Sequence, residues 1–262
     1  MARSRWTPSR STSAKMIDVA DLLHLPAREA PPQLLFIHLH AVGAQPLAMV
    51  PVAERFAAAF PRAVHLLPDG FEAYDLGGEG RQWFSVRGLD DDNRPQRVAA
   101  VLPKLAQLVI AAQHHFGVGS PSTALIGYSQ GGIVALEAAQ LEPPLAGRVV
   151  AIAARYATLP ERAPAATVLH LAHGKDDSVV PARFAVEAAT RLVALGGDVT
   201  ADIVPGIGHA PHPELVDRAI GHMQTYLPRR VWAEALAAAP VHSTRVSSKQ
   251  LASPIPDSKR RH

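Results

Sequence analysis

Short apolar runs alternate with longer segments of helical periodicity along most of the chain. Runs that are nearly continuous in Val, Ile, Leu and Ala are typical of strands buried on both faces of a parallel sheet. Such runs predict strands over residues 33–40, 63–67, 123–126, 148–154, 167–172 and 199–204. Helical spacing predicts helices over residues 46–60, 94–116, 130–136, 181–195 and 213–227. This alternation predicts an α/β fold: a single domain with a mostly parallel, doubly wound sheet and helices on both faces.

Two segments interrupt the regular alternation. Pro103 lies inside the periodic segment 94–116, which predicts either one kinked helix or two shorter ones. The chain from Pro68 to about Asn93 is rich in Gly and Asp and contains no long apolar run. Loops of this length within a compact domain are usually functional or disordered, and its Trp and Phe argue against disorder. We expect this loop to form a wall of the functional site.

The ends of the chain differ from its middle. Residues 1–30 are predicted to form a polar extension, residues 31–239 the α/β domain, with a last helix over 229–239, and residues 240–262 a disordered polar tail. The Arg- and Ser-rich start lacks the apolar core of a secretory signal, and an organelle-targeting segment is a minor alternative. No run is long enough to span a bilayer. We therefore expect a cytoplasmic protein without stable membrane insertion.

Composition excludes several classes of function. The 262 residues include no Cys, which excludes disulfides, thiolate metal sites and a cysteine nucleophile. The formal net charge is +3, and the basic residues that raise the isoelectric point gather at the two ends. Basic residues interleaved with aromatic ones are absent from the sequence pattern, so nucleic-acid binding is not expected. With 48% hydrophobic residues, the chain has enough apolar material for a sizeable core.

The sharpest local signal is Gly127-Tyr128-Ser129-Gln130-Gly131, which follows an apolar strand and precedes a helix. Gly-x-Ser-x-Gly in this context is typical of a nucleophile elbow, a strained turn that lifts the serine hydroxyl clear of the sheet. The same turn places the N-terminus of the helix beneath the serine. Ser129 is therefore the candidate nucleophile.

A serine hydroxyl needs a base, and the base needs an orienting carboxylate. Asp176 and Asp177 both follow the strand predicted over 167–172, and we prefer Asp177 because Asp176 is better suited to cap a helix or to face solvent. His209 follows the last predicted strand and is the candidate base, whereas His212 lies among prolines at a helix start. The order Ser, Asp, His is the one that this kind of fold supplies.

Charge that develops on a carbonyl oxygen is stabilised by two converging backbone N–H groups. One is expected from Gln130, directly after the nucleophile, and the other from the loop after the first predicted strand, where we favour Val42. His38, His40 and Gly43 in this region are interpreted as loop-packing residues. The sequence contains neither a His-Glu-x-x-His metal motif nor a phosphate-binding Gly-rich loop. We therefore predict no metal and no cofactor.

Taken together, these motifs resemble the carboxylesterase/phospholipase family of α/β-hydrolases, which includes acyl-protein thioesterases. The motifs that carry the resemblance are Leu39-His40-Ala41-Val42-Gly43, Arg81-Gln82-Trp83-Phe84, Gly127-Tyr128-Ser129-Gln130-Gly131, His173-Gly174-Lys175-Asp176-Asp177-Ser178-Val179-Val180-Pro181 and Gly208-His209. The resemblance covers about residues 33 to 227 and is strongest to the bacterial esterase branch.

The resemblance implies a catalytic triad of Ser129, Asp177 and His209, and a substrate cleft bordered by Trp83 and Phe84. The family usually has glycine where this chain has Ala41, so we expect the oxyanion loop to differ locally or to carry strain. Members hydrolyse carboxylic esters, thioesters and lysophospholipids, and dimers occur among them.

The leading hypothesis is a serine hydrolase that cleaves short- to medium-chain carboxylic esters through an acyl-enzyme. An acyl thioesterase or lysophospholipase is the alternative within the family, and the partner is then a small-molecule ester or thioester. A catalytically silent binding protein of the same fold and a peptidase are the remaining alternatives. Either a monomer or a homodimer is compatible with the sequence.

Overall fold

A computed structural model describes residues 18–229 and 231. The chain separates into two compact units, Met1–Tyr226 and Leu227–His262, and every feature discussed below belongs to the first. The helix predicted over 229–239 falls outside the described residues except at 229 and 231, and the tail from 240 lies wholly outside them. The domain boundaries predicted from the sequence therefore stay a prediction.

The first unit is organised around a seven-stranded sheet with the strand order β1-β3-β2-β6-β7-β8-β9. Its strands are β1 (His24–Leu25), β2 (Leu34–Leu39), β3 (Ala63–Leu66), β6 (Thr123–Tyr128), β7 (Arg148–Ile152), β8 (Val168–Gly174) and β9 (Val199–Val204). Every neighbouring pair is parallel except β1 and β3, which are antiparallel.

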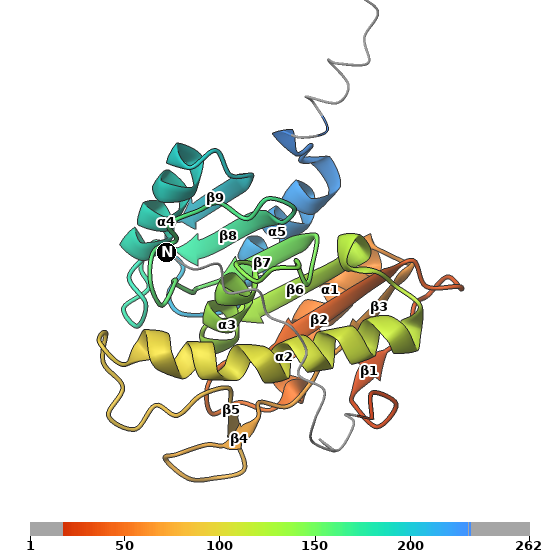
Figure 1. Ribbon diagram of the computed structural model, residues 1–262, viewed down its shortest axis with the longest axis horizontal. Helices are drawn as coiled ribbons and strands as arrows, with labels where there is room; N and C mark the ends of the chain where they lie inside the picture. Colours follow the sequence, from red (N-terminus) through yellow and green to blue (C-terminus); the bar gives the residue numbers. More distant parts are fainter. Residues whose placement is uncertain (1–17, 230, 232–262) are drawn as a thin grey trace, which may run out of the picture. The chain divides into compact units, whose positions relative to one another are not determined.

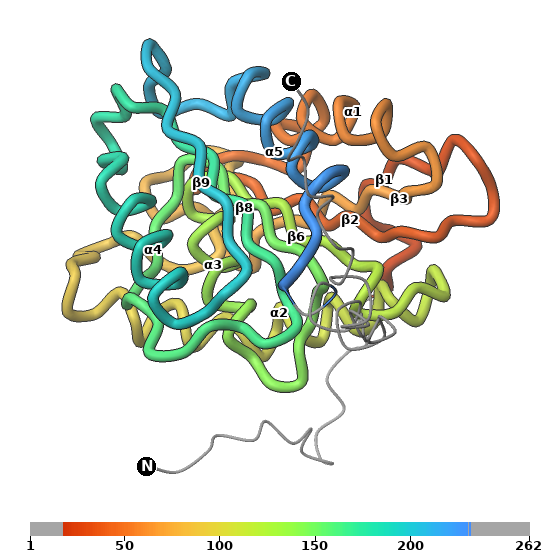
Figure 2. The backbone as a smooth tube through the Cα atoms, turned by 90° about the horizontal axis from the view of Figure 1, so that it is seen from above, coloured from red at the N-terminus to blue at the C-terminus, as the bar shows by residue number. Residues whose placement is uncertain are grey.

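Helices cover both faces of this sheet. They are η1 (Pro46–Met49), α1 (Val50–Ala59), α2 (Arg94–Phe116), η2 (Ser120–Ser122), α3 (Gln130–Ala138), α4 (Arg183–Ala194) and α5 (Pro213–Thr225). Helices α1 and α5 lie on one face, and α2 and α3 lie on the other (Figures 1 and 2). The predicted fold class, a mostly parallel doubly wound α/β sheet, is confirmed.

The apolar runs have a direct physical cause in this layered arrangement. In β2, Leu35, Ile37 and Leu39 contribute to the core shared with α2 and α3, whereas Phe36 contributes to the core shared with α1 and α5. Successive side chains of a strand point to opposite faces, so a strand covered on both faces must be apolar at nearly every position. The other central strands, β6, β7 and β8, alternate in the same way between the two cores.

Residues 94–116 form one helix, α2, with Pro103 inside it, so the alternative of two shorter helices is excluded. Two other local features differ from the sequence prediction. The predicted helix 46–60 begins with a short 3₁₀ turn, η1, before α1. Residues 18–30, assigned to a polar extension, include β1, which pairs with β3, and Val19, which is buried. A two-residue edge strand carries no periodicity that a sequence pattern can detect.

The long loop before α2 contains a small hairpin formed by β4 (Glu72–Ala73) and β5 (Arg81–Gln82). The carboxylate of Asp75 accepts hydrogen bonds from the Ser85 hydroxyl and from the N–H groups of Val86 and Arg87. These bonds, led by that from Ser85, lower the pKa of Asp75 to about 2. The loop is thus held together by a carboxylate that is charged at neutral pH.

The strand order identifies the place where a site forms. From β2 the chain passes outward to β3, and then returns to β6 on the other side of β2. Loops that leave the carboxyl ends of β2 and β6 therefore diverge and leave a crevice between them, which is where open α/β sheets bind ligands. The loop with Val42 follows β2, and Ser129 follows β6.

Two histidines form a buried pair between β2 and β3. Nε2 of His38 lies 2.9 Å from Nδ1 of His65, and both side chains are fully buried. Burial, with the charge of Arg28, lowers the pKa of His65 to about 4, and burial lowers the pKa of His38 well below its usual value. Both rings are therefore neutral packing residues at neutral pH.

Replacing His65 by Phe should flatten the acid side of the stability curve. The pKa of His65 is depressed from 6.5 to about 4, so the unfolded chain binds the extra proton between these values and stability falls as the pH drops through them. We expect wild type to lose up to about 3 kcal/mol more than His65→Phe over this interval. Urea unfolding at a series of pH values measures both losses, and equal losses would contradict the assignment.

Candidate active site

Ser129 occupies a strained backbone position at the junction of β6 and α3. Its φ is 52° and its ψ is −116°. Non-glycine residues rarely adopt a positive φ, and such outliers cluster at functional sites. The N–H of Ser129 donates to the carbonyl of Ile152 at 3.0 Å, which ties the turn to the end of β7. The residue as a whole is 8% exposed.

The glycines on either side of Ser129 allow this turn because backbone approaches them closely. A Cβ at Gly127 would lie 2.4 Å from the carbonyl oxygen of Gly131, and a Cβ at Gly131 would lie 2.2 Å from the carbonyl oxygen of Leu39. Real Cβ atoms do not make contacts this short. The sequence signature Gly-x-Ser-x-Gly thus reflects the tight packing of β6, α3 and the end of β2.

The side chains of Ser129, His209 and Asp177 form a hydrogen-bonded chain across three loops. Oγ of Ser129 lies 3.0 Å from Nε2 of His209, and Nδ1 of His209 lies 2.7 Å from Oδ2 of Asp177. A carboxylate only accepts hydrogen bonds, so Nδ1 carries the proton and donates it to Asp177. Nε2 is then free to accept the hydrogen bond from the serine hydroxyl. The structure brings together the three residues that the sequence singled out.

Asp177 is held as a charged acceptor. Its Oδ1 accepts hydrogen bonds from the N–H groups of Val179 at 2.9 Å and Val180 at 2.8 Å. Burial raises the pKa of Asp177, but the hydrogen bonds from His209 and from these two N–H groups outweigh burial and lower it below 3.8. Asp176, the other candidate acid, has a different partner: its carboxylate accepts the N–H of Gly206 at 2.9 Å.

Two side chains near the site were not predicted. Nε2 of His173 lies 2.7 Å from the carbonyl of Val180 and 3.2 Å from Oδ2 of Asp177. The hydroxyl of Tyr128 donates to the carbonyl of His209 at 3.0 Å, and the two rings lie 5.3 Å apart. His173 opens the motif that ends in Asp177, which is a sequence signal, whereas the Tyr128 contact joins residues 81 positions apart and has none.

The loop after β2 is organised by His40. Nδ1 of His40 donates to the carbonyl of Ala41 at 2.7 Å, and its Nε2 accepts the N–H of Gly70 at 2.9 Å. Burial lowers the pKa of His40 and keeps the ring neutral. The expected strain at Ala41 is not present, because Ser129 and Ala153 are the only non-glycine residues with positive φ among the described residues.

Gln130 uses its side chain as a clamp in addition to its backbone. Its Oε1 accepts the N–H of Trp83 and its Nε2 donates to the carbonyl of Phe84, each at 2.8 Å. Trp83 in turn donates through Nε1 to the carbonyl of His40 at 2.8 Å. This chain of hydrogen bonds links the start of α3 to the loop with Val42. Within the described residues, the N–H groups of Val42 and Gln130 donate to no protein acceptor.

Trp83 and Phe84 are buried rather than displayed on an open surface. Trp83 is 0% and Phe84 2% exposed, and the Trp83 ring packs against His40 and Phe71. In this position Trp83 contacts the loop after β2 through the ring and the carbonyl of His40. The role in substrate binding that the resemblance implies for Trp83 and Phe84 therefore stays a prediction.

The parallel sheet, its crossovers and the elbow that carries Ser129 define an α/β-hydrolase. Among residues 18–229 and 231, no cluster of three or more His, Asp or Glu side chains is arranged to hold a metal ion. In the same part of the chain, no helix is both long enough and apolar enough to cross a membrane.

Comparison with known proteins agrees with this class. The sequence profile described as phospholipase/carboxylesterase matches residues 23–227. Esterase YpfH of Escherichia coli (strain K12) is 43% identical over 209 residues, which cover 80% of this chain and 90% of YpfH. Acyl-protein thioesterase 1 of Gibberella zeae is 26% identical over 160 residues, which cover 56% of this chain and 68% of that protein.

Solved structures agree as well. The crystal structure of esterase PE8 superposes with a TM-score of 0.72 at 24% identity, covering 79% of this chain and 98% of PE8. The chain belongs to the phospholipase/carboxylesterase family. It is a hydrolase of the carboxylesterase type.

Gly131→Ala should destabilise the protein, because the new Cβ would force α3 away from the carbonyls of Leu39 and His40. We expect the free energy of unfolding to fall by about 1–3 kcal/mol, as for other overpacked sites. Gly221→Ala in α5 is the matched control, since its Cβ would meet nothing within 4 Å. Alanine in a helix interior should raise stability by about 0.5–1 kcal/mol there. A neutral Gly131→Ala variant in urea unfolding would contradict the close approach.

Proposed function

We propose that the protein is a serine hydrolase that cleaves short- to medium-chain carboxylic esters through a covalent acyl-enzyme. The observation that carries the proposal is the hydrogen-bonded chain from Ser129 through His209 to Asp177. The similarity to esterase YpfH over most of both chains supports an ester substrate.

In this mechanism the Ser129 oxygen attacks the ester carbonyl while Nε2 of His209 takes its proton. Asp177 holds the imidazole in the required tautomer and stabilises the imidazolium that forms. The protonated Nε2 then gives the proton to the leaving alcohol, and the acyl group remains bonded to Ser129. His209 then takes a proton from a water molecule, whose oxygen attacks the acyl carbon. The bond from this carbon to Oγ of Ser129 breaks, the carboxylic acid leaves, and His209 returns the proton to Oγ.

The negative charge that develops on the carbonyl oxygen is stabilised by the backbone N–H groups of Gln130 and Val42. Neither N–H donates to an acceptor within the described part of the chain, so both are available to the substrate. The side chain of Gln130 binds the N–H of Trp83, and the ring of Trp83 donates to the carbonyl of His40, so hydrogen bonds link the two loops that carry these N–H groups. Such preorganised donors act without reorganising during the reaction.

An acyl thioesterase is the second candidate, because acyl-protein thioesterase 1 of Gibberella zeae is among the relatives. The Ser129 oxygen is able to attack the carbonyl carbon of an ester or of a thioester by the same mechanism. We propose a small-molecule substrate in either case, a cytoplasmic location, and a monomer or homodimer that works without a metal or cofactor.

Ser129→Ala should abolish hydrolysis of a p-nitrophenyl ester series from acetyl to decanoyl. Removal of a triad nucleophile is expected to lower kcat at least about a thousandfold, leaving the fold intact. Ser122→Ala is the matched control, since Ser122 precedes β6 at the end opposite Ser129. Full turnover in Ser129→Ala would refute the mechanism, and turnover in neither protein would favour the silent binding protein.

Ethyl butyrate and its S-ethyl thioester separate the two candidate activities. We expect kcat/KM for the oxygen ester to equal or exceed that for the thioester, measured by proton release for the ester and by thiol release for the thioester. A preference for the thioester of more than about tenfold, which corresponds to 1.4 kcal/mol of transition-state stabilisation, would establish the thioesterase alternative instead.

A further inference from the structure

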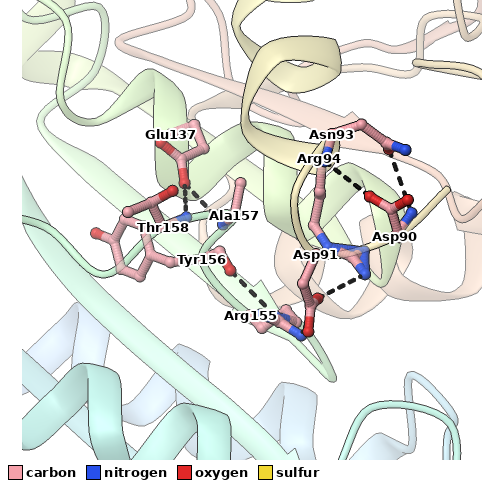
Figure 3. A network of polar contacts seen from close by, with 9 residues as sticks. All are labelled: Asp90, Asp91, Asn93, Arg94, Glu137, Arg155, Tyr156, Ala157 and Thr158. Atoms are coloured by element: carbon pink, nitrogen blue, oxygen red, sulfur yellow. Dashed lines mark hydrogen bonds and ion pairs between the residues drawn. The ribbon is translucent and has the colours of Figure 1, made fainter.

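Two arginines converge on one carboxylate beside the catalytic edge of the sheet. Arg94 begins α2 and Arg155 follows β7, and each donates to the same oxygen, Oδ1 of Asp91, at 3.1 Å (Figure 3). The proposed triad does not use these residues. We refer to Arg94 and Arg155 below as the arginine pair.

The three side chains in this contact differ in how far they are exposed to solvent. The side chains of Arg94 and Arg155 are only 16% and 18% exposed, whereas that of Asp91 is 72% exposed. Burial, together with the charge of Arg155, lowers the pKa of Arg94. The neighbouring Asp90 uses its carboxylate to accept the N–H of Asn93 within its own loop. Two mostly buried cations therefore share one carboxylate that stands largely in water.

Most N–H groups of the arginine pair have no acceptor among residues 18–229 and 231. A guanidinium carries five N–H donors. Within the described residues, the Arg94 side chain donates only to Asp91, and its buried Nε has no partner. Arg155 donates to Asp91 and, through Nε, to the carbonyl of Tyr156. The pair thus has the capacity to bind a further acceptor group.

The guanidinium of Arg155 is positioned by an aromatic ring. It lies over the ring of Phe184 in α4 at 3.9 Å, and Arg183 lies 4.6 Å from the same ring. Stacking of this kind holds the guanidinium plane while leaving its N–H edges free to donate. Arg183 adds a third positive charge to the cluster.

The segment with Arg155 is anchored to the helix that carries the nucleophile. Oε1 of Glu137, in α3, accepts the N–H groups of Ala157 at 2.8 Å and Thr158 at 3.3 Å (Figure 3). Burial raises the pKa of Glu137. This contact fixes the loop after β7 relative to Ser129, whose own N–H donates to Ile152 at the end of the same strand.

The arginine pair also belongs to the same edge of the sheet as the triad. Arg94 follows the loop that Gln130 clamps through Trp83 and Phe84. Phe184 lies seven positions after Asp177, and Arg155 lies three after the last residue of β7. Loops at the carboxyl ends of parallel strands gather around one crevice, so groups on them are able to meet one substrate.

We propose that the arginine pair binds a carboxylate of the substrate, so that the enzyme prefers esters whose acyl or alcohol part carries a free carboxyl group. This proposal rests on the serine esterase function proposed above. The carboxylate of Asp91 already shows which chemistry fits between the two guanidinium groups, and its exposure allows a substrate carboxylate to replace it. Arginine is suited to this task because its planar fork matches a carboxylate.

The test compares esters of equal chain length that end in either a carboxylate or a methyl group. Monomethyl esters of succinic, glutaric and adipic acid are paired with the methyl esters of butanoic, pentanoic and hexanoic acid, and kcat/KM is measured by proton release. A second series places the carboxylate on the alcohol, as butyryl esters of hydroxy acids against butyryl esters of matched alcohols. The quantity of interest is the ratio of kcat/KM for the charged ester to that for the neutral one.

We expect this ratio to fall at least about tenfold in Arg155→Gln and in Arg94→Gln, the usual effect of losing a charge-assisted hydrogen bond. Asp91→Asn should raise the ratio, because it removes the competing carboxylate while altering an exposed side chain. Arg218→Gln, which removes an exposed arginine of α5, is the matched control and should leave the ratio unchanged. Addition of salt should lower the ratio in wild type by screening.

Binding without turnover separates failure of this proposal from failure of the esterase function. Calorimetry should detect monomethyl glutarate binding to Ser129→Ala and a loss of at least about tenfold in affinity when Arg94→Gln or Arg155→Gln is added. Circular dichroism verifies the fold of each variant, and Asp91→Asn gives an independent test where an arginine variant unfolds. Unchanged ratios and unchanged affinity would overturn the subsite, even if Ser129-dependent hydrolysis of neutral esters is intact.

Discussion

The positive φ of Ser129 is the constraint on which the rest of the site depends. A residue held in this conformation between a buried strand and a helix points its side chain away from the sheet. It also brings the first turn of α3 into backbone contact with β6 and with the end of β2, which only Gly127 and Gly131 permit. Ser129, the start of α3 and the end of β2 are therefore in direct backbone contact, and the side-chain hydrogen bonds of Gln130 and Trp83 add to this contact.

Other loops join this unit by the same kind of close approach. A Cβ at Gly174 would lie 2.2 Å from the carbonyl oxygen of Ile207, so the loop with Asp177 packs directly on the loop with His209. The hydrogen bonds of Gln130 to Trp83 and Phe84 then add the long loop before α2. The loops around the candidate site are thus held by direct packing on one another, in addition to their attachment to the sheet.

Burial sorts the polar side chains of this protein into two kinds. Burial lowers the pKa of His65 to about 4 and that of His170 to about 3, so these rings pack as neutral groups. Asp177 is also buried, but it receives enough hydrogen bonds to stay charged beside His209. Arg94 and Arg155 are mostly buried with few acceptors among the described residues, which makes them candidates for contact with a ligand.

Local sequence patterns were enough to predict the six longer strands and the five α-helices in their order, together with the candidates Ser129, Asp177 and His209. These depend on local features: apolar periodicity, and polar motifs placed directly after strands. Four features became visible only in the folded chain: β1 joins the sheet, Trp83 is buried, Ala41 does not adopt a positive φ, and Arg94 and Arg155 meet at Asp91. These facts depend on packing between segments far apart in the chain, and a single sequence carries no local pattern for such contacts.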